Sequence, residues 1–140
     1  MSSWVISSNP ATYDAKNAFL DNVEVDWATK QDFEVGDTVY IYEVIPPRGR
    51  GGIMYKTKVI KTDLTLKDKF DDRRHWVGQT YPKNINEFTK FSRLSLIEES
   101  NNKKLSLGTL KAYDFTPPQG LAHLLDKKPK LLIYVESCFS

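Results

Sequence analysis

The stretch TVYIYEVI at residues 38–45 is joined by the loop PPRGRGG at residues 46–52 to IMYKTKVIK at residues 53–61. Both flanking segments are rich in β-branched and aromatic residues, which is typical of β-strands. Successive side chains of a strand point to opposite faces, so Tyr40 and Tyr42 are expected to share a face. Because a glycine- and proline-rich loop connects the two segments, we expect an antiparallel strand pair.

Short elements are expected on both sides of this pair. Residues 3–7 are predicted to form a buried strand, and residues 89–98 a third strand. A helix is expected to begin at Asn9 and Pro10 and to end near residue 20, because asparagine is a favoured N-cap and proline suits the first turn. Several short strands with a few short helices predict a compact α+β, barrel-like fold.

The remaining segments have weaker patterns. Residues 106–113 and 121–125 are predicted to form short helical segments. Residues 130–138 have strand propensity but are also compatible with a helix. Two charged or polar stretches lack clean periodicity and are expected to be irregular, namely residues 21–36 and 62–86.

The composition is that of one globular domain covering residues 1–140. Apolar residues make up 40% and charged residues 27%, and no apolar run is long enough to span a membrane, so no membrane partner is expected. The N-terminal segment lacks the pattern of a signal peptide. The single cysteine, Cys138, excludes an internal disulfide and a cysteine-based metal site. A cytoplasmic location is therefore expected.

No motif in the chain predicts catalysis. His75 and His123 have no second histidine or cysteine at metal-binding spacing. The segment at residues 49–52 lacks the Lys-Ser/Thr ending of a phosphate-binding loop. We expect no enzymatic activity, no metal and no cofactor. A small hydrolase that uses the acidic loop at residues 68–72 is kept as an alternative.

Aromatic and basic residues are interleaved at several points, as in proteins that bind nucleic acid. The chain has 3 Trp, 7 Tyr and 7 Phe, and Tyr55-Lys56 is one such pairing. Cations follow phosphates while aromatic faces stack bases, each stacked base contributing about 1–3 kcal/mol. Two or three aromatic rings can therefore offset the few kcal/mol needed to flip a base out of a duplex.

An ordered set of motifs resembles the EVE family of the PUA-like superfamily. The motifs are WVISSNP (4–10), VDW (25–27), VGDTVYIY (35–42), IMYKTKV (53–59), HWV (75–77), FSRLSLI (91–97) and PPQG (117–120). The resemblance implies a PUA-like distorted β-barrel with short helices packed around it. It also implies kinship with YTH domains, which hold a methylated adenine in an aromatic cage. Some EVE domains recognise modified cytosine for restriction systems, often beside a nuclease domain, and no nuclease motif is present here.

The same resemblance indicates where a base would bind. By similarity to the YTH pocket, the end of the first strand lines the site, and Trp27 matches the tryptophan that stacks on the flipped base. Residues 91–95 of the third strand match the opposite wall, and Phe91 is the candidate among them. Tyr42 and Trp76 are further candidates, although either could instead serve the core or anchor a lid. The first-strand residues are Ser7, Ser8 and Asn9, of which Asn9 has an alternative role as a helix cap.

Four basic residues are candidates for contacts to the nucleic-acid backbone. Arg48 and Arg50 lie on the glycine-rich loop, where they could probe a groove or simply form a hairpin tip. Lys56 and Arg93 lie within predicted strands, where they could clamp phosphates or form an ordinary solvated face.

The sequence thus predicts a module that binds DNA or RNA and takes one base, methylated or hydroxymethylated cytosine for example, into an aromatic pocket. A nuclease acting as a separate subunit is a possible partner. The alternatives are a generic PUA-like RNA-binding module without a modified-base requirement, a small hydrolase, and a protein-interaction or small-ligand domain.

Overall fold

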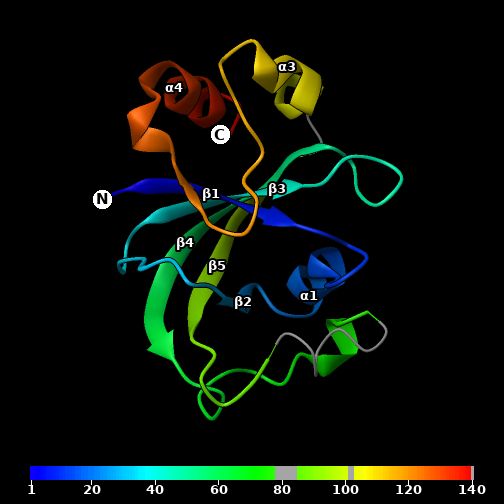
Figure 1. The fold of residues 1–140 in the computed structure, drawn as a ribbon, viewed down its shortest axis with the longest axis vertical. Coiled ribbons are helices and arrows are strands. Elements are labelled where there is room, and N and C mark those ends of the chain that lie inside the picture. Colours follow the sequence, from blue (N-terminus) through cyan, green and yellow to red (C-terminus); the bar gives the residue numbers. More distant parts are fainter. Residues whose placement is uncertain (78–84, 101–102, 140) are drawn as a thin grey trace.

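The computed structural model describes residues 1–77, 85–100 and 103–139, and a strongly curved six-stranded sheet runs through them (Figure 1). The strand order is β2-β5-β4-β3-β1-β6. β1 and β3 are parallel, and the other neighbouring pairs are antiparallel. The strands are β1 Ser3–Ser8, β2 Glu24–Ala28, β3 Thr38–Glu43, β4 Gly52–Leu64, β5 Phe91–Glu99 and β6 His123–Leu124.

Short helices surround the sheet. The helices are α1 Ala15–Asp21, α3 Leu107–Lys111 and α4 Pro129–Ser137, and the 3-10 turns are η1 Arg73–His75, η2 Lys103–Leu105 and η3 Leu125–Lys127. None of the helices in the described part of the chain is long and apolar enough to cross a membrane.

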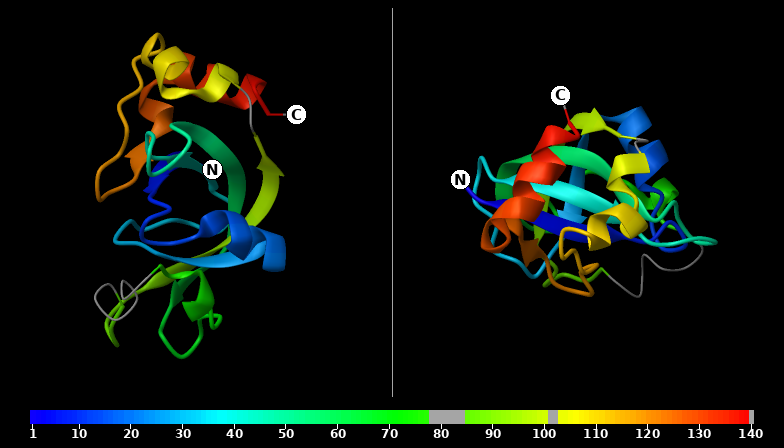
Figure 2. Two further views of the ribbon diagram at one scale, coloured as in Figure 1. Left: turned by 90° about the vertical axis from the view of Figure 1, so that its right-hand side faces the viewer. Right: turned by 90° about the horizontal axis from the view of Figure 1, so that it is seen from above.

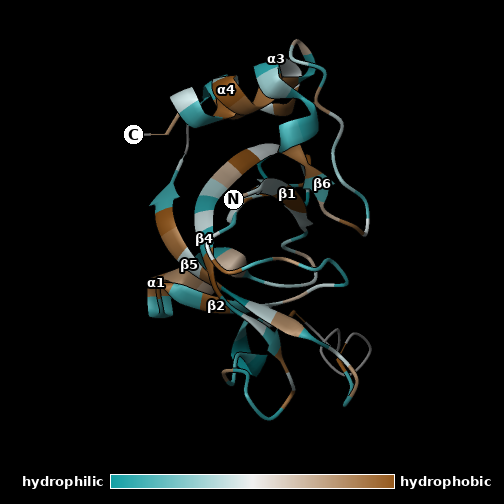
Figure 3. Ribbon diagram, turned by 90° about the vertical axis from the view of Figure 1, so that its left-hand side faces the viewer, coloured by the Kyte–Doolittle hydropathy of each residue, from teal (hydrophilic) through white to brown (hydrophobic). Residues whose placement is uncertain are grey.

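The predicted α+β class and the β3–β4 pair are confirmed, but the sheet does not close into a barrel. Its two edge strands, β2 and β6, are not hydrogen-bonded to each other within the described residues. The sheet curls toward closure, as Figure 3 shows. β6 has only two residues and β2 only five, so neither edge offers a long ladder for closure.

One core cluster lies on the face of the sheet that carries Val39 and Ile41. α1 contributes Ala18 and Phe19 to it, and the Phe19 ring lies 5.0 Å from the Tyr55 ring, measured between centroids. Trp27 is partly buried and packs against the same cluster. The inner face of the curved sheet is therefore filled mainly by its own side chains and by α1.

A second core cluster lies on the opposite face, where α3 and α4 pack over the sheet (Figure 2). Tyr40 and Tyr42 both belong to it, which confirms that they share a face of β3. A register shift in the β3–β4 ladder pairs Tyr42 with Ile53 but Ile41 with Tyr55. This bulge interrupts the alternation of side chains along β4, so that Ile53 and Tyr55 belong to different clusters although they are two residues apart.

The first helix begins later than predicted. The carbonyl of Asn9 accepts the N–H groups of Thr12 and Tyr13, while its side-chain oxygen accepts the N–H of Ala11 at 2.9 Å. Asn9 thus stabilises a turn, and the cap of α1 is Asp14, whose carboxylate accepts a backbone N–H in the first turn.

Two segments differ from their predicted structure. Residues 21–36 are not wholly irregular, because they contain β2. Residues 121–125 are not a helix but contain β6, which pairs with β1. For residues 130–138, the structure decides in favour of a helix: Leu131 and Val135, four residues apart, are buried in α4, while Ile133 is exposed.

Candidate functional site

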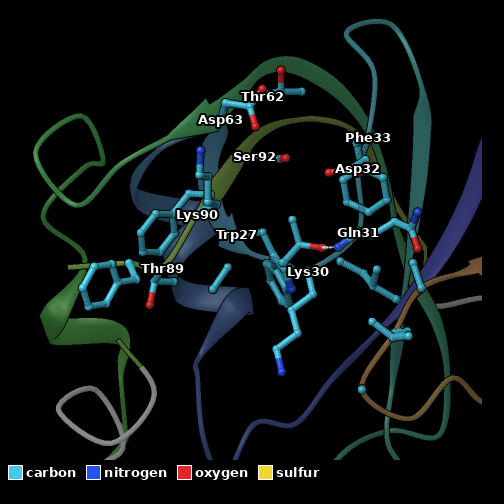
Figure 4. Close-up of a pocket in the computed structure, with 18 of the residues that line it drawn as sticks. Trp27, Lys30, Gln31, Asp32, Phe33, Thr62, Asp63, Thr89, Lys90 and Ser92 are labelled. Atoms are coloured by element: carbon cyan, nitrogen blue, oxygen red, sulfur yellow. Dashed lines mark hydrogen bonds between the residues drawn. The ribbon is translucent and has the colours of Figure 1, made fainter. Parts of the chain in front are cut away.

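A hollow of about 1050 Å³ lies beside Trp27, between the two edges of the sheet (Figure 4). One side comes from the end of β2, the segment after it and the start of β5. The other side comes from β1 and the loop that leads to β6. The residues that line it are Ile6, Ser7, Trp27, Ala28, Thr29, Lys30, Gln31, Asp32, Phe33, Thr62, Asp63, Asn86, Phe88, Thr89, Lys90, Phe91, Ser92, Gly120, Leu121 and Ala122. The open sheet edge is therefore where the molecule is hollowed.

Trp27 is held by β-sheet pairing and by an aromatic contact. It pairs with Ser92 in the β2–β5 ladder. The Tyr13 ring meets its indole edge-on, with the centroids 5.7 Å apart and the planes at 77°. Part of the Trp27 side chain remains exposed in the hollow. The indole thus offers an accessible aromatic surface that is fixed from behind.

The segment after β2 turns back against β5 and forms the next part of the wall. The N–H of Thr29 donates to the carbonyl of Lys90 at 3.2 Å, and the N–H of Gln31 donates to the Thr29 hydroxyl oxygen at 2.9 Å. Lys30, between these two anchors, is exposed and extends away from the Trp27 ring (Figure 4). Phe33 is buried nearby, and its ring meets that of Trp4 at a centroid distance of 5.6 Å.

A buried ion pair joins β2 to β5 directly beside Trp27. Asp26 accepts two hydrogen bonds from Arg93, with Nε to Oδ1 at 2.7 Å and Nη2 to Oδ2 at 3.0 Å. Asp26 Oδ2 also accepts the N–H of Phe70 at 2.7 Å, and the Arg93 guanidinium lies 3.9 Å from the centre of the Phe70 ring. These bonds to Asp26 raise the pKa of Arg93 above its ordinary value.

Arg93 is therefore not on a phosphate-facing surface, and this part of the prediction is corrected. Only 9% of its side chain is exposed, and its guanidinium is bound to a carboxylate and to the carbonyl of Asp68. Burial of an arginine requires such a partner, because an unpaired charge is costly to desolvate. One feature of the sequence could have indicated this ion pair. An acidic residue, Asp26, lies between the apolar residues Val25 and Trp27.

Asp72 ties the loop after β4 to the back of the site. It accepts hydrogen bonds from the Tyr13 hydroxyl at 3.2 Å and from Trp76 Nε1 at 3.2 Å, and it forms a 2.7 Å ion pair with Lys69. Burial, followed by the negative charge of Asp72, raises the pKa of the Tyr13 phenol. Tyr13 thus stays protonated and keeps its ring fixed against Trp27.

The end of β1 contributes one side chain to the hollow. Ser7 lines it, and the Ser7 hydroxyl donates to the carbonyl of Pro118, which fastens the loop leading to β6. Since the Ser7 proton is already donated, the free lone pair of its oxygen can only accept a hydrogen bond. Ser8 is buried, and Asn9 is used in the turn described above, so neither lines the hollow.

The structure brings Ser7, Trp27 and Phe91 together and separates the other predicted pocket residues from them. Phe91 lines the hollow although only 1% of it is exposed. Tyr42 is corrected to a core residue: it lies in the second cluster, with its ring 5.3 Å from that of Phe115. Trp76 does not line the hollow but packs behind it against Tyr13, at a centroid distance of 5.1 Å.

The other predicted phosphate-binding residues also lie outside the hollow. Arg50 is engaged by Glu43, with Nη2 to Oε2 at 2.9 Å, and by the Tyr55 hydroxyl at 3.1 Å. Hydrogen bonding to Glu43 raises the pKa of Arg50. Arg48 is exposed on the loop between β3 and β4, and Lys56 is half-buried on β4.

Several residues of the hollow were not recognised in the sequence. The sequence pattern does not identify Lys30, Phe33 and Lys90, because nothing local shows that the segment after Trp27 folds back against the residues before β5. The available signal was the spacing of two between Val25 and Trp27, which is a strand pattern.

Within the described residues, no group of three or more His, Cys, Asp or Glu side chains is arranged to hold a metal ion. The acidic loop at residues 68–72 uses its carboxylates locally. Asp68 accepts the N–H and the hydroxyl of Thr65, at 3.1 and 2.8 Å, and its pKa is lowered by these bonds. Asp72 is bound as described above.

Comparisons with known proteins give a likeness of fold. Neither the protein-family models nor the curated proteins contain a match to this sequence. Among solved structures, ASCH from Zymomonas mobilis has a TM-score of 0.65 at 17% identity, covering 94% of each chain. The DUF55 domain of human thymocyte nuclear protein 1 has a TM-score of 0.63 at 12% identity, covering 99% of this chain and 100% of that chain.

A further similar structure is that of human THYN1 protein in complex with 5-methylcytosine containing DNA, with a TM-score of 0.59 at 13% identity over 97% of each chain. At such low identity the likeness establishes the fold alone. The structural neighbours of this chain thus include an ASCH protein and a DUF55 domain.

Proposed function

We propose that this protein is an EVE-type nucleic-acid-binding module that takes one flipped base into the hollow beside Trp27. The observation that carries the proposal is the partly exposed Trp27, which lies in a hollow between the two sheet edges and is backed by Tyr13. The likeness of fold to a protein crystallised with 5-methylcytosine containing DNA supports the same reading.

The size of the hollow is compatible with this ligand. Small-molecule sites enclose roughly 300–1,000 Å³, and the hollow of about 1050 Å³ lies just above that range. A base stacked on Trp27 would gain about 1–3 kcal/mol, comparable with the few kcal/mol needed to flip it. The walls also include the apolar side chains of Ala28 and Ala122, against which a methyl group can pack.

The polar groups of the hollow favour a base with an exocyclic amino group. Ser7 presents a hydrogen-bond acceptor, and the carboxylates of Asp32 and Asp63 are exposed in the lining. Cytosine and adenine carry an amino donor that such groups can accept from. We therefore propose a modified cytosine as the ligand, with a methylated adenine as the second choice.

Phosphates would be bound by lysines at the rim. Lys30 and Lys90 both line the hollow and are exposed. In Figure 4, Lys30 points to the side of the hollow opposite Thr62 and Asp63, so its ammonium is directed away from the Asp63 carboxylate. The proposed role is binding without catalysis, because the acidic side chains at Asp68 and Asp72 are occupied by structural hydrogen bonds.

Replacing Trp27 tests the base pocket. Trp27→Ala is expected to weaken binding to an oligonucleotide with one 5-methylcytosine by about 5- to 150-fold, the equivalent of one stacked base. Trp27→Phe keeps an aromatic face and is expected to retain most of the affinity. The measurement is a fluorescence-anisotropy titration with methylated, hydroxymethylated and plain cytosine, and with methylated adenine.

Tyr113→Ala serves as the control, because Tyr113 is an exposed aromatic residue that does not line the hollow. If the Trp27→Ala variant prefers modified over plain oligonucleotides by the same affinity ratio as the wild type, the pocket assignment is wrong. Equal binding of all oligonucleotides by the wild type would instead favour the generic RNA-binding alternative.

A further inference from the structure

Two large apolar side chains stand exposed at the hollow. Phe88 is 81% exposed and Leu121 is 55% exposed, and both belong to its lining. They come from different loops: Phe88 precedes β5, and Leu121 precedes β6. Other phenylalanines around the hollow, Phe33 and Phe91, are buried. Phe88 is thus an aromatic ring that the fold leaves in solvent next to the proposed base pocket.

The backbone around Phe88 is fixed by a local network of hydrogen bonds. The N–H of Phe88 donates to the side-chain oxygen of Asn86 at 2.8 Å, and the N–H of Asn86 donates to the Thr89 hydroxyl oxygen at 3.0 Å. The N–H of Thr89 also donates to the carbonyl of Asn86 at 3.1 Å. Buried Ile85 and Phe91 anchor the two ends of this turn. The turn therefore presents Phe88 in a defined position.

An exposed apolar side chain beside a base pocket has a physical use when the ligand is a duplex. Flipping a base leaves a gap in the stack, and the neighbouring bases then lose their stacking partner. Proteins that distort a duplex often insert Phe, Leu, Ile or Met between base steps. Single-stranded nucleic acid has no such gap, so an exposed ring can stack on one base of a single strand but has no broken stack to fill.

We propose that Phe88 inserts into the base stack of a duplex and fills the space that the flipped base leaves, so that the target of this protein is double-stranded. This inference rests on the proposed function of the hollow and adds the strandedness of the target. The lysine two residues along, Lys90, lines the hollow and is placed to meet the adjoining phosphate backbone.

The experiment compares duplex with single strand. The wild type, Phe88→Ala and Phe88→Leu are titrated with a short duplex containing one 5-methylcytosine, with the methylated single strand alone, and with the same single strand unmodified. Phe88→Ala is expected to weaken duplex binding by at least about fivefold, which corresponds to about 1 kcal/mol for one stacked ring, and to weaken single-strand binding by a smaller factor. Phe88→Leu is expected to retain most of the duplex affinity, because leucine also serves as an inserted side chain.

Ile133→Ala is the matched control. Ile133 is 66% exposed and Phe88 is 81% exposed, but Ile133 lies on α4 and does not line the hollow. It is expected to leave both titrations unchanged.

Three results would overturn the proposal: an equal loss on both substrates, no loss on the duplex, or a wild type that binds the single strand and not the duplex. Failure of the base pocket itself is visible separately, as a wild type that does not prefer the methylated over the unmodified single strand.

Discussion

Asp26 shows how one residue can fix the geometry of a site without touching the ligand. It lies one position before Trp27, on the opposite side of β2, and accepts hydrogen bonds from Arg93 and from the N–H of Phe70. The three groups come from β2, β5 and the loop after β4. The strand that carries Trp27 is therefore tied to β5 and to this loop by an ion pair, which the sequence presents only as two separate charged residues.

Breaking this pair is expected to destabilise the fold. Arg93→Ala leaves the Asp26 carboxylate buried and without its counter-ion, and such a change costs about 3–5 kcal/mol. The free energy of unfolding, measured by urea denaturation, gives the value. The pair Arg74–Asp21 is a suitable control because both side chains are largely exposed, so Arg74→Ala is expected to cost only about 0–1 kcal/mol. Equal losses from the two substitutions would contradict the structural role assigned to Arg93.

At the scale of elements, α4 is a helix whose residues have strand propensity. Two features favour the helix instead: Pro129 occupies its first turn, and its buried residues are four positions apart. These buried side chains complete the cluster formed by Tyr40, Tyr42 and Leu110 on the outer face of the sheet. The helix is stabilised by tertiary packing more than by its own propensity.

A matched pair of substitutions in α4 separates packing from helix propensity. Leu131→Ala is expected to lower the free energy of unfolding by about 2–5 kcal/mol, since Leu131 is 2% exposed and its removal leaves a cavity. Ile133→Ala on the exposed face is expected to change it by no more than about 0.5 kcal/mol. Urea denaturation of both variants supplies the test. A large loss from Ile133→Ala would show that this face of α4 is covered by another part of the molecule.

At the scale of the whole molecule, the hollow lies where the two edges of the sheet, in the part of the chain that the structure describes, fail to pair with each other. β2 and β6 do not meet in the described residues, and the hollow is lined from both sides of this opening. The net charge of +2 means that the overall electrostatic attraction to nucleic acid is small. Binding is therefore expected to depend on stacking in the hollow more than on a broad basic surface.

This balance predicts a shallow dependence of affinity on salt. If Lys30 and Lys90 are the phosphate contacts, the logarithm of the binding constant is expected to fall with the logarithm of the salt concentration with a slope of about −2 for a duplex. Lys30→Ala is expected to reduce the slope by about one, whereas Lys130→Ala on α4 is expected to leave it unchanged. Titrations at several salt concentrations give the slopes. A slope many times steeper would place the phosphate contacts elsewhere on the surface.

The sequence by itself determined the α+β class and the strand pair built from residues 38–61, because alternation along a strand and loop chemistry are local properties. It also singled out Ser7, Trp27 and Phe91, which the structure brings to one hollow. Local patterns failed at β2, because its five residues give an alternation too short to stand out within a polar stretch.

Only the tertiary structure decided that the sheet stays open, that Arg93 and Tyr42 are buried, and that Phe88 and Lys30 stand beside Trp27. The physical reason is that these features depend on contacts between segments far apart in the chain. Asp26 and Arg93, for example, are separated by 67 positions, and the burial of each charge is possible only because the other is present.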